Sequence, residues 1–255
     1  MRVWRERRGL SQLHLATEAE ISQKHLSFLE SGRSAPSRDM VLRLAEHLDI
    51  PLRERNDLLL AAGYAPVFQE RSLSDASLAR ARAMMEQVLK AHEPYPALAV
   101  DRHWTMVAAN AAVAPLLVGA DPELLKPPVN VLRVSLHPRG LAPLIVNLAE
   151  WRSHLLERLR RQLRLTCDPV IKALLEELTA YPTNGSRDVR PSHVGHDDIA
   201  VPFRLRTHAG VLSFLSTVTV FGTAVEITLA ELSLEAFYPA DQVTAAALQS
   251  NLQRM

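Results

Sequence analysis

Serines and glycines divide residues 1–65 into short segments. This spacing of helix starts and helix ends limits the possible folds more than any other feature of the chain. Apolar residues recur with helical spacing after three serines, Ser11, Ser22 and Ser37. A serine at that place fits the helix N-cap, where its side-chain oxygen accepts an otherwise unpaired backbone N–H. Gly32 and Gly63 fit the left-handed position that follows a helix C-terminus. Residues 1–65 are therefore predicted to form an all-α domain of short helices.

Two of these segments, residues 10–16 and 21–26, have the spacing of a helix-turn-helix unit. Ala16 is small enough to let two helices cross closely, and Ile21 supplies an apolar residue for the turn between them. Leu26 and Leu29 give the second helix an apolar inner face. The outer face of that second helix is the one that such a unit places in the major groove of double-stranded DNA.

The outer face carries side chains that can read bases. Gln23 can pair with adenine, Lys24 can reach guanine or a phosphate, and Phe28 can contact a thymine methyl group. An alternative for Phe28 is partial packing against the next helix. Gln12 and Arg33 stand where phosphate contacts are expected. The complete set of predicted DNA-binding residues is Gln12, Ser22, Gln23, Lys24, Ser27, Phe28 and Arg33.

The charge balance indicates how such binding would work. The formal net charge of the 255-residue chain is only +1. Residues 1–43 hold eight basic and five acidic side chains, whereas residues 44–70 hold two basic and five acidic ones. Bulk attraction to phosphate is therefore modest. We expect binding to rely on base contacts and on two copies of the chain, each meeting one half-site of an operator.

The sequence changes character after residue 65. Residues 66–95 are predicted to form a connector with a linking helix from Ser74 to about His92. Residues 96–255 are predicted to form an α+β domain. Its expected elements are a strand pair over 97–100 and 104–109, a helix from Asn110 and two helices between 140 and 180 divided at Asp168-Pro169. Strands are expected within 201–237, including 227–231 and a further alternation over 232–237 on a shifted phase, and a closing helix over 239–252.

No catalytic constellation is visible, so we predict that the protein is not an enzyme and has no cofactor. His193, His196, Asp197 and Asp198 lie in a Pro- and Gly-containing loop without metal-ligand spacing, which favours a solvated loop over a metal site. Cys167 is the single cysteine, expected to be half-buried, and it rules out an internal disulfide. No apolar leader or membrane-spanning stretch is present in the sequence. We therefore expect a cytoplasmic protein without membrane association.

The first domain resembles the Xre/Cro-type helix-turn-helix of bacterial and phage repressors. Three stretches carry the resemblance: Ser11-Gln12, the run from Leu29 to Arg33, and Pro36-Ser37. The family usually has glycine in the tight turn where this chain has Glu20. The resemblance therefore implies a left-handed backbone at Glu20, at some energetic cost.

The second domain resembles the MmyB-like ligand-binding domain, which is PAS-like and often follows an Xre-type helix-turn-helix. The resemblance rests on residues 99–104, 108–110, 201–207, 210–223, 226–232 and 237–241. It implies an antiparallel sheet backed by helices around an apolar cavity. It also implies a small hydrophobic effector, such as a bound fatty acid, inside that cavity.

Twelve residues are candidates for contact with such a ligand. The apolar ones are Trp104, Met106, Leu132, Leu144, Trp151, Leu155, Phe203, Leu205, Phe214 and Val218, and the polar ones are His137 and Arg152. Each apolar residue could equally fill a packed core. Strand alternation places Arg204 and Arg206 opposite Phe203 and Leu205, so both arginines are predicted to lie at the surface.

These observations predict a homodimeric transcription regulator that binds double-stranded DNA and senses a small hydrophobic ligand. The main alternative is a DNA-binding regulator whose C-terminal domain serves only dimerisation or contact with another protein. An enzyme tethered to DNA is a further alternative, and it would require a polar cleft or a metal. A fully packed sheet domain would favour the dimerisation alternative, whereas an apolar cavity would favour the ligand sensor.

Overall fold

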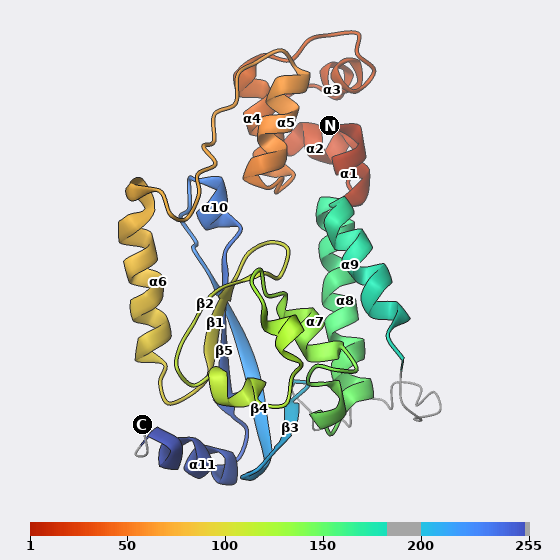
Figure 1. Ribbon diagram of the computed structural model, residues 1–255. Coiled ribbons are helices and arrows are strands. Elements are labelled where there is room, and N and C mark those ends of the chain that lie inside the picture. Colours follow the sequence, from red (N-terminus) through yellow and green to blue (C-terminus); the bar gives the residue numbers. More distant parts are fainter. Residues whose placement is uncertain (183–199, 253–255) are drawn as a thin grey trace. The chain divides into compact units, whose positions relative to one another are not determined.

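The computed structural model describes residues 1–182 and 200–252, which form two compact units (Figure 1). The first unit contains Met1–Ser72 together with Arg164–Thr166 and Gly222–Ala230. The second unit contains the other described residues, beginning at Leu73. The predicted metal-free loop with His193, His196, Asp197 and Asp198 lies outside the described residues.

The first unit is helical. Its helices are α1 (Arg2–Arg7), α2 (Gln12–Glu18), α3 (Gln23–Glu30), α4 (Arg38–His47), α5 (Leu52–Ala61) and the short α10 (Ile227–Ala230). Their shared core includes the fully buried Leu15, Leu26, Leu44 and Leu48. Because those four side chains come from different segments of a short chain, each helix is stabilised by burying one apolar face rather than by its own length.

The predicted helix caps and turns are confirmed. The hydroxyl oxygens of Ser11, Ser22 and Ser37 accept the backbone N–H groups of the residues three positions later, at 3.0, 3.1 and 3.2 Å. Glu20 has the left-handed backbone expected between α2 and α3, with φ of 54°. Gly32 and Gly63 are left-handed as well, with φ of 72° and 84°.

Residues 227–230 form helix α10, so the strand predicted over 227–231 is wrong. Five residues of alternating polarity fit one helical turn as well as a strand. Local hydrogen bonds decide between them, because Glu226 Oε2 accepts the N–H of Leu229 at 2.9 Å and thereby caps the turn. Glu226 Oε1 also accepts the N–H of Arg71, and Ile227 N–H donates to the Gln69 carbonyl. This turn is therefore fixed to residues 69–71.

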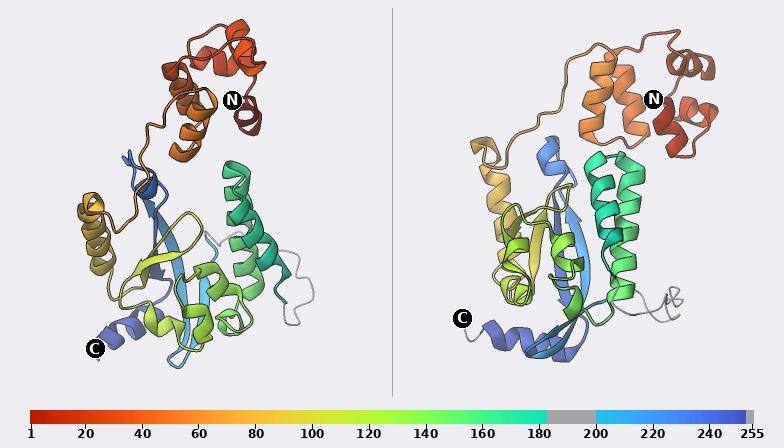
Figure 2. Two further views of the ribbon diagram at one scale, coloured as in Figure 1. Left: turned by 45° about the horizontal axis from the view of Figure 1, so that its top comes forward. Right: turned by 45° about the vertical axis from the view of Figure 1, so that its right-hand side comes forward.

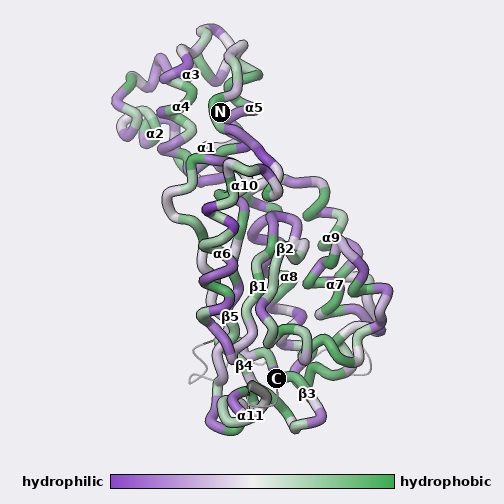
Figure 3. The backbone as a smooth tube through the Cα atoms, turned by 60° about the vertical axis from the view of Figure 1, so that its left-hand side comes forward, coloured by the Kyte–Doolittle hydropathy of each residue, from purple (hydrophilic) through white to green (hydrophobic). Residues whose placement is uncertain are grey.

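The second unit is built on a five-stranded antiparallel sheet in the order β2-β1-β5-β4-β3 (Figure 2). The strands are β1 (Ala97–Val100), β2 (Met106–Ala109), β3 (Phe203–Thr207), β4 (Gly210–Val220) and β5 (Ser233–Pro239). The residues of β1 and β2 are mainly hydrophobic (Figure 3). Together the units confirm the predicted fold class, which is a helical domain followed by an α+β domain with an antiparallel sheet.

Helices cover both faces of the sheet. The linking helix α6 (Ala79–Ala91) lies on one side, and α7 (Val131–Leu136), α8 (Leu148–Thr166) and α9 (Pro169–Ala180) lie on the other (Figures 1 and 2). The remaining elements are four 3-10 turns and the closing helix: η1 (Ala76–Leu78), η2 (Ala114–Leu117), η3 (Pro122–Leu125), η4 (Ala142–Leu144) and α11 (Gln242–Leu252). Among the described residues, no helix is long and apolar enough to cross a membrane.

The main core lies between the sheet and α7–α9. Phe203 of β3 packs 5.0 Å from Trp151 of α8 and 6.1 Å from Phe214 of β4, measured between ring centroids. Side chains alternate along β3, so Phe203 is buried while Arg204 and Arg206 are exposed, as predicted. The split between α8 and α9 is confirmed too, because Asp168 caps α9 through the N–H of Val170 at 2.8 Å.

Two local predictions are wrong. No regular helix starts at Asn110, which instead is buried and joins three backbone segments through its side chain. Its amide oxygen accepts the N–H of Ala97, and its amide nitrogen donates to the carbonyls of Leu89 and Tyr95. Cys167 is exposed rather than half-buried, and it ends α8 in a left-handed conformation with φ of 52°.

Candidate functional site

The outer face of α3 presents polar, cationic and aromatic side chains together. Gln23 and Lys24 are exposed, while Ser27 and Phe28 are half-buried. The Lys24 Nζ lies 5.7 Å from the centroid of the Phe28 ring, and the Arg33 guanidinium carbon lies 5.9 Å from it. Phe28 therefore organises two cations by cation–π contact. An aromatic ring between two positive groups suits contact with bases and with the phosphates beside them.

Two of the predicted DNA-binding residues already have partners within the unit. Ser22 is the N-cap of α3, so its hydroxyl oxygen is used by the N–H of His25. Gln12 donates from Nε2 to Glu30 Oε2 at 2.8 Å, which fixes the start of α2 against the end of α3. Contact of all seven residues with DNA remains a prediction.

A buried ion pair ties α1 to the end of α3. Arg5 donates from Nε and Nη2 to the two carboxylate oxygens of Glu30, at 2.8 and 2.9 Å. The side chains are 9% and 2% exposed, so the pair is shielded from water. Burial alone would raise the pKa of Glu30, but hydrogen bonds from Arg5 and Gln12 outweigh burial and hold that pKa below its usual value. The pair positions α3 without facing outward.

The second unit contains an apolar cavity between the sheet and helices α7 and α8. Five of the predicted ligand-contact residues line it: Met106, Leu132, Trp151, Leu155 and Phe203. The sequence did not single out the other lining residues, which are Pro96, Leu98, Val113, Leu116, Leu117, Val129, Val131, Val134, Ser135, Leu141, Glu235 and Phe237. The volume of the cavity that the centre of a water-sized sphere can reach is about 90 Å³. This is several times the roughly 10–15 Å³ that one buried water needs on the same measure.

The other seven predicted residues are not among those that line this cavity. Leu205 and Phe214 are fully buried in the core, whereas Val218 is 47% exposed. Leu144 packs against the same core. His137 packs edge-on against Tyr181, and Arg152 donates to the carbonyls of residues 178, 179 and 181. Trp104 is buried in the same core, and the Arg158 guanidinium carbon lies 4.6 Å from the centroid of its ring.

Two polar side chains line the cavity, and sequence reasoning missed both. Ser135 Oγ accepts the indole N–H of Trp151 at 3.0 Å. Glu235, on β5, is only 7% exposed, and its Oε1 accepts a hydrogen bond from Arg158 Nη1 at 2.7 Å. The available signal was strand alternation, because Glu235 and Phe237 stand two residues apart and therefore face the same side of the sheet.

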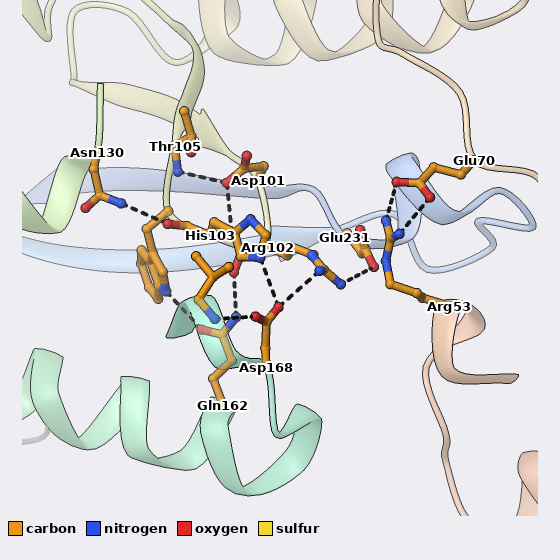
Figure 4. Close-up of polar contacts among 12 residues, drawn as sticks. Arg53, Glu70, Asp101, Arg102, His103, Thr105, Asn130, Gln162, Asp168 and Glu231 are labelled. Carbon is orange, nitrogen blue, oxygen red and sulfur yellow. Dashed lines mark hydrogen bonds and ion pairs between the residues drawn. The ribbon is translucent and has the colours of Figure 1, made fainter. Parts of the chain in front are cut away.

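A cluster of polar side chains joins the turn between β1 and β2 to α8 and to the start of α9 (Figure 4). Asp168 pairs with His103 at 2.9 Å and with Arg102 at 3.1 Å, and Gln162 connects to the same turn through the Trp104 indole and the Arg102 carbonyl. Burial opposes ionisation of Asp168, yet these partners and the Val170 N–H lower its pKa. The cluster holds the β1–β2 turn against the junction of α8 and α9.

None of these polar groups forms a metal centre. Within residues 1–182 and 200–252, no group of three or more His, Cys, Asp or Glu side chains is arranged to hold a metal ion. The cluster around Asp168 is a set of neutralised ion pairs with structural partners. Its effect is therefore to position Trp104 and, through the stacked guanidinium, Arg158.

Comparison with known families agrees with both domains. A helix-turn-helix family model matches residues 1–55, and the family model described as the MmyB-like transcription regulator ligand binding domain matches residues 81–250. No curated protein matches the chain. Both resemblances stated from the sequence are thereby confirmed. The chain belongs to the family of MmyB-like transcription regulators, with an N-terminal Xre-type helix-turn-helix for DNA and a C-terminal domain that senses a ligand.

Proposed function

We propose that this regulator responds to a small hydrophobic effector with an aliphatic chain, similar in that respect to a fatty acid. The observation that carries the proposal is the cavity between the sheet and helices α7 and α8. Apart from Ser135 and Glu235, the side chains that line it are aliphatic, aromatic or, in Met106, a thioether. Such a lining, with a few placed polar groups, is typical of sites for apolar small molecules.

The energetics of the cavity support a bound ligand. An aliphatic chain that binds in this pocket removes its apolar lining from water, which is favourable. It also brings carbon atoms into contact with that lining. The cavity also weighs against the alternative in which the C-terminal domain serves only dimerisation or protein contact, since that role needs no interior space.

The DNA-binding part of the proposal concerns α3 and its copy in a second chain. One helix-turn-helix contacts a short half-site, so a homodimer on a double-stranded operator is the expected arrangement. Gln23, Lys24, Ser27 and Phe28 would contact bases, and Arg33 would contact a phosphate. The ligand would regulate binding only if it favours one arrangement of the two DNA-binding units over another. In this proposal the protein works in the cytoplasm without cofactor or catalysis.

Native mass spectrometry of the purified full chain tests the ligand. We expect a mass above that of the polypeptide, which after denaturation and organic extraction yields an aliphatic compound. We also expect added aliphatic compounds of 8–14 carbons to raise the melting temperature, because a ligand that binds only the folded state stabilises it. A chain that carries no ligand and shows no shift with any of these compounds would contradict the proposal.

A further inference from the structure

The segment 222–230, which contains α10, lies between β4 and β5 in the chain but belongs to the helical first unit. Residues 67–71, the strap that follows α5, belong to the same unit. The return from α10 to β5 is short, since it consists of Glu231 and Leu232 alone. Leu232 is 1% exposed, and Glu231 pairs with Arg102 at 3.5 Å. This connection between the two units is therefore short and held at its β5 end.

Helix α10 and the residue before it hold the backbone of the strap by three hydrogen bonds. Glu226 Oε1 accepts the N–H of Arg71 at 2.8 Å, and Thr228 Oγ1 donates to the Arg71 carbonyl at 2.6 Å. The N–H of Ile227 donates to the Gln69 carbonyl at 2.9 Å. Glu226 and Ile227 are buried, so water competes poorly for these bonds.

The strap is also held to α5 of the DNA-binding domain. Asn56 Oδ1 accepts the N–H groups of Val67 and Phe68 at 2.9 and 3.1 Å, and its Nδ2 donates to the Phe68 carbonyl at 2.7 Å. Arg53 pairs with Glu70 through two hydrogen bonds, at 2.6 and 2.5 Å (Figure 4). The strap therefore has partners on α5 and on α10, and a shift relative to either helix breaks hydrogen bonds.

Strand β5 also forms part of the cavity wall, through Glu235 and Phe237. These residues lie opposite Val218 and Ser216 in the antiparallel ladder between β5 and β4. Helix α10 lies in the loop between the same two strands. A ligand that displaces β5 acts on the strand end next to α10, since packed elements shift as units rather than bend continuously.

We propose that α10 is the coupling element of this regulator, which converts a ligand-dependent displacement of β5 into a change in how the strap holds α5. Glu226 and Thr228 are positioning residues in this scheme, because their partners lie on the strap and neither residue lines the cavity. The inference rests on the proposed function, since it assumes that the cavity binds an effector. It goes beyond that proposal by naming the residues that connect ligand binding to DNA binding.

A double variant, Glu226→Ala with Thr228→Val, tests the coupling by removing both side-chain bonds to Arg71. The coupling ratio is the operator affinity of the full chain with a saturating straight-chain fatty acid, divided by the affinity without it. The acid used is the one of 8–14 carbons that binds most tightly. We expect at least about a fivefold change in the wild type and less than about twofold in the variant. Calorimetric affinity for the acid should change by less than about twofold, because the cavity lining is untouched.

Thr223→Val is the matched control, because it alters an exposed threonine of the same loop and should keep the wild-type ratio. Thr228→Val alone, which preserves the shape of the side chain, should give an intermediate ratio and decides the matter if the double variant does not fold. Hydrogen exchange followed by mass spectrometry checks the strap without any ligand. The Arg71 amide should exchange at least about fivefold faster in the double variant than in the wild type.

The possible outcomes separate the two proposals. A folded variant that keeps the wild-type ratio, or an Arg71 amide that exchanges at the wild-type rate, would overturn the coupling role of α10. Wild-type protein that binds the acid without any change in operator affinity would overturn it too, while leaving the ligand site intact. Wild-type protein that binds none of the acids would contradict the proposed function as well.

Discussion

Replacement of Glu30 by alanine is expected to destabilise the helix-turn-helix unit by about 3–5 kcal/mol and to abolish operator binding at ordinary temperature. The substitution leaves the Arg5 guanidinium buried without its carboxylate, and loss of one partner from a buried pair typically costs this much. It also removes the acceptor of Gln12. Chemical denaturation followed by circular dichroism measures the loss. Glu18→Ala is the matched control, since Glu18 is 43% exposed and pairs with the exposed His14.

The lowered pKa of Glu30 predicts how the free energy of unfolding depends on pH. The folded-state pKa of Glu30 lies below the ordinary value of 4.5, so its contribution is fully present above that value. The contribution is lost as the pH falls from about 4.5 through the folded-state pKa. Glu30→Gln should therefore show a smaller decrease in stability over this acidic range than the wild-type chain. Parallel curves for the two proteins would contradict the role given to the Arg5–Glu30 pair.

Replacement of Gln23 or Lys24 by alanine is expected to weaken specific operator binding by about 1–3 kcal/mol each, if each makes a bidentate base contact. The double variant should lose about 2–6 kcal/mol, because the two side chains are expected to contact different bases and their effects then add. Both residues are exposed, so folding should be unaffected. Binding to selected operator DNA and to unrelated DNA, measured by fluorescence anisotropy, separates specific from general effects.

Arg33→Ala provides the contrasting variant. As a phosphate contact it should lower affinity for all sequences alike and reduce the dependence of binding on salt concentration. Because Arg33 and Lys24 both contact Phe28, their effects are expected to be partly coupled. Wild-type operator affinity in both the Gln23→Ala and Lys24→Ala variants would contradict the assignment of α3 as the base-reading helix.

Local rules were sufficient for much of the fold. Ser11, Ser22 and Ser37 predicted three helix starts because an N-cap depends only on residues within one turn. The left-handed Glu20 followed from the resemblance to the Xre/Cro-type turn, in which glycine is usual at this position. In the second unit, alternation over β3 predicted which side chains are buried. Signals of this kind fail where a short segment fits two periods, as in α10, whose helix depends on Glu226 and on contact with residues 69–71.

The candidate sites were less accessible to sequence reasoning. Arg5 and Glu30 are 25 positions apart, and no local pattern indicates that they meet. The division of apolar residues between cavity and core depends on how strands and helices pack, so Leu155 and Phe214 could not be distinguished by residue type. Glu235 was overlooked because a charged residue in a strand usually indicates a solvent-exposed face, whereas here Arg158 neutralises it inside the domain.

The central claim is that a ligand in the cavity changes how the protein binds DNA. Its most direct test is the affinity of the full chain for operator DNA selected in vitro, measured with and without a saturating amount of the aliphatic probe of 8–14 carbons that binds most tightly. We predict at least about a fivefold change in operator affinity, the lower end of ordinary allosteric coupling. A probe that binds the protein in calorimetry and leaves operator affinity unchanged would contradict the account.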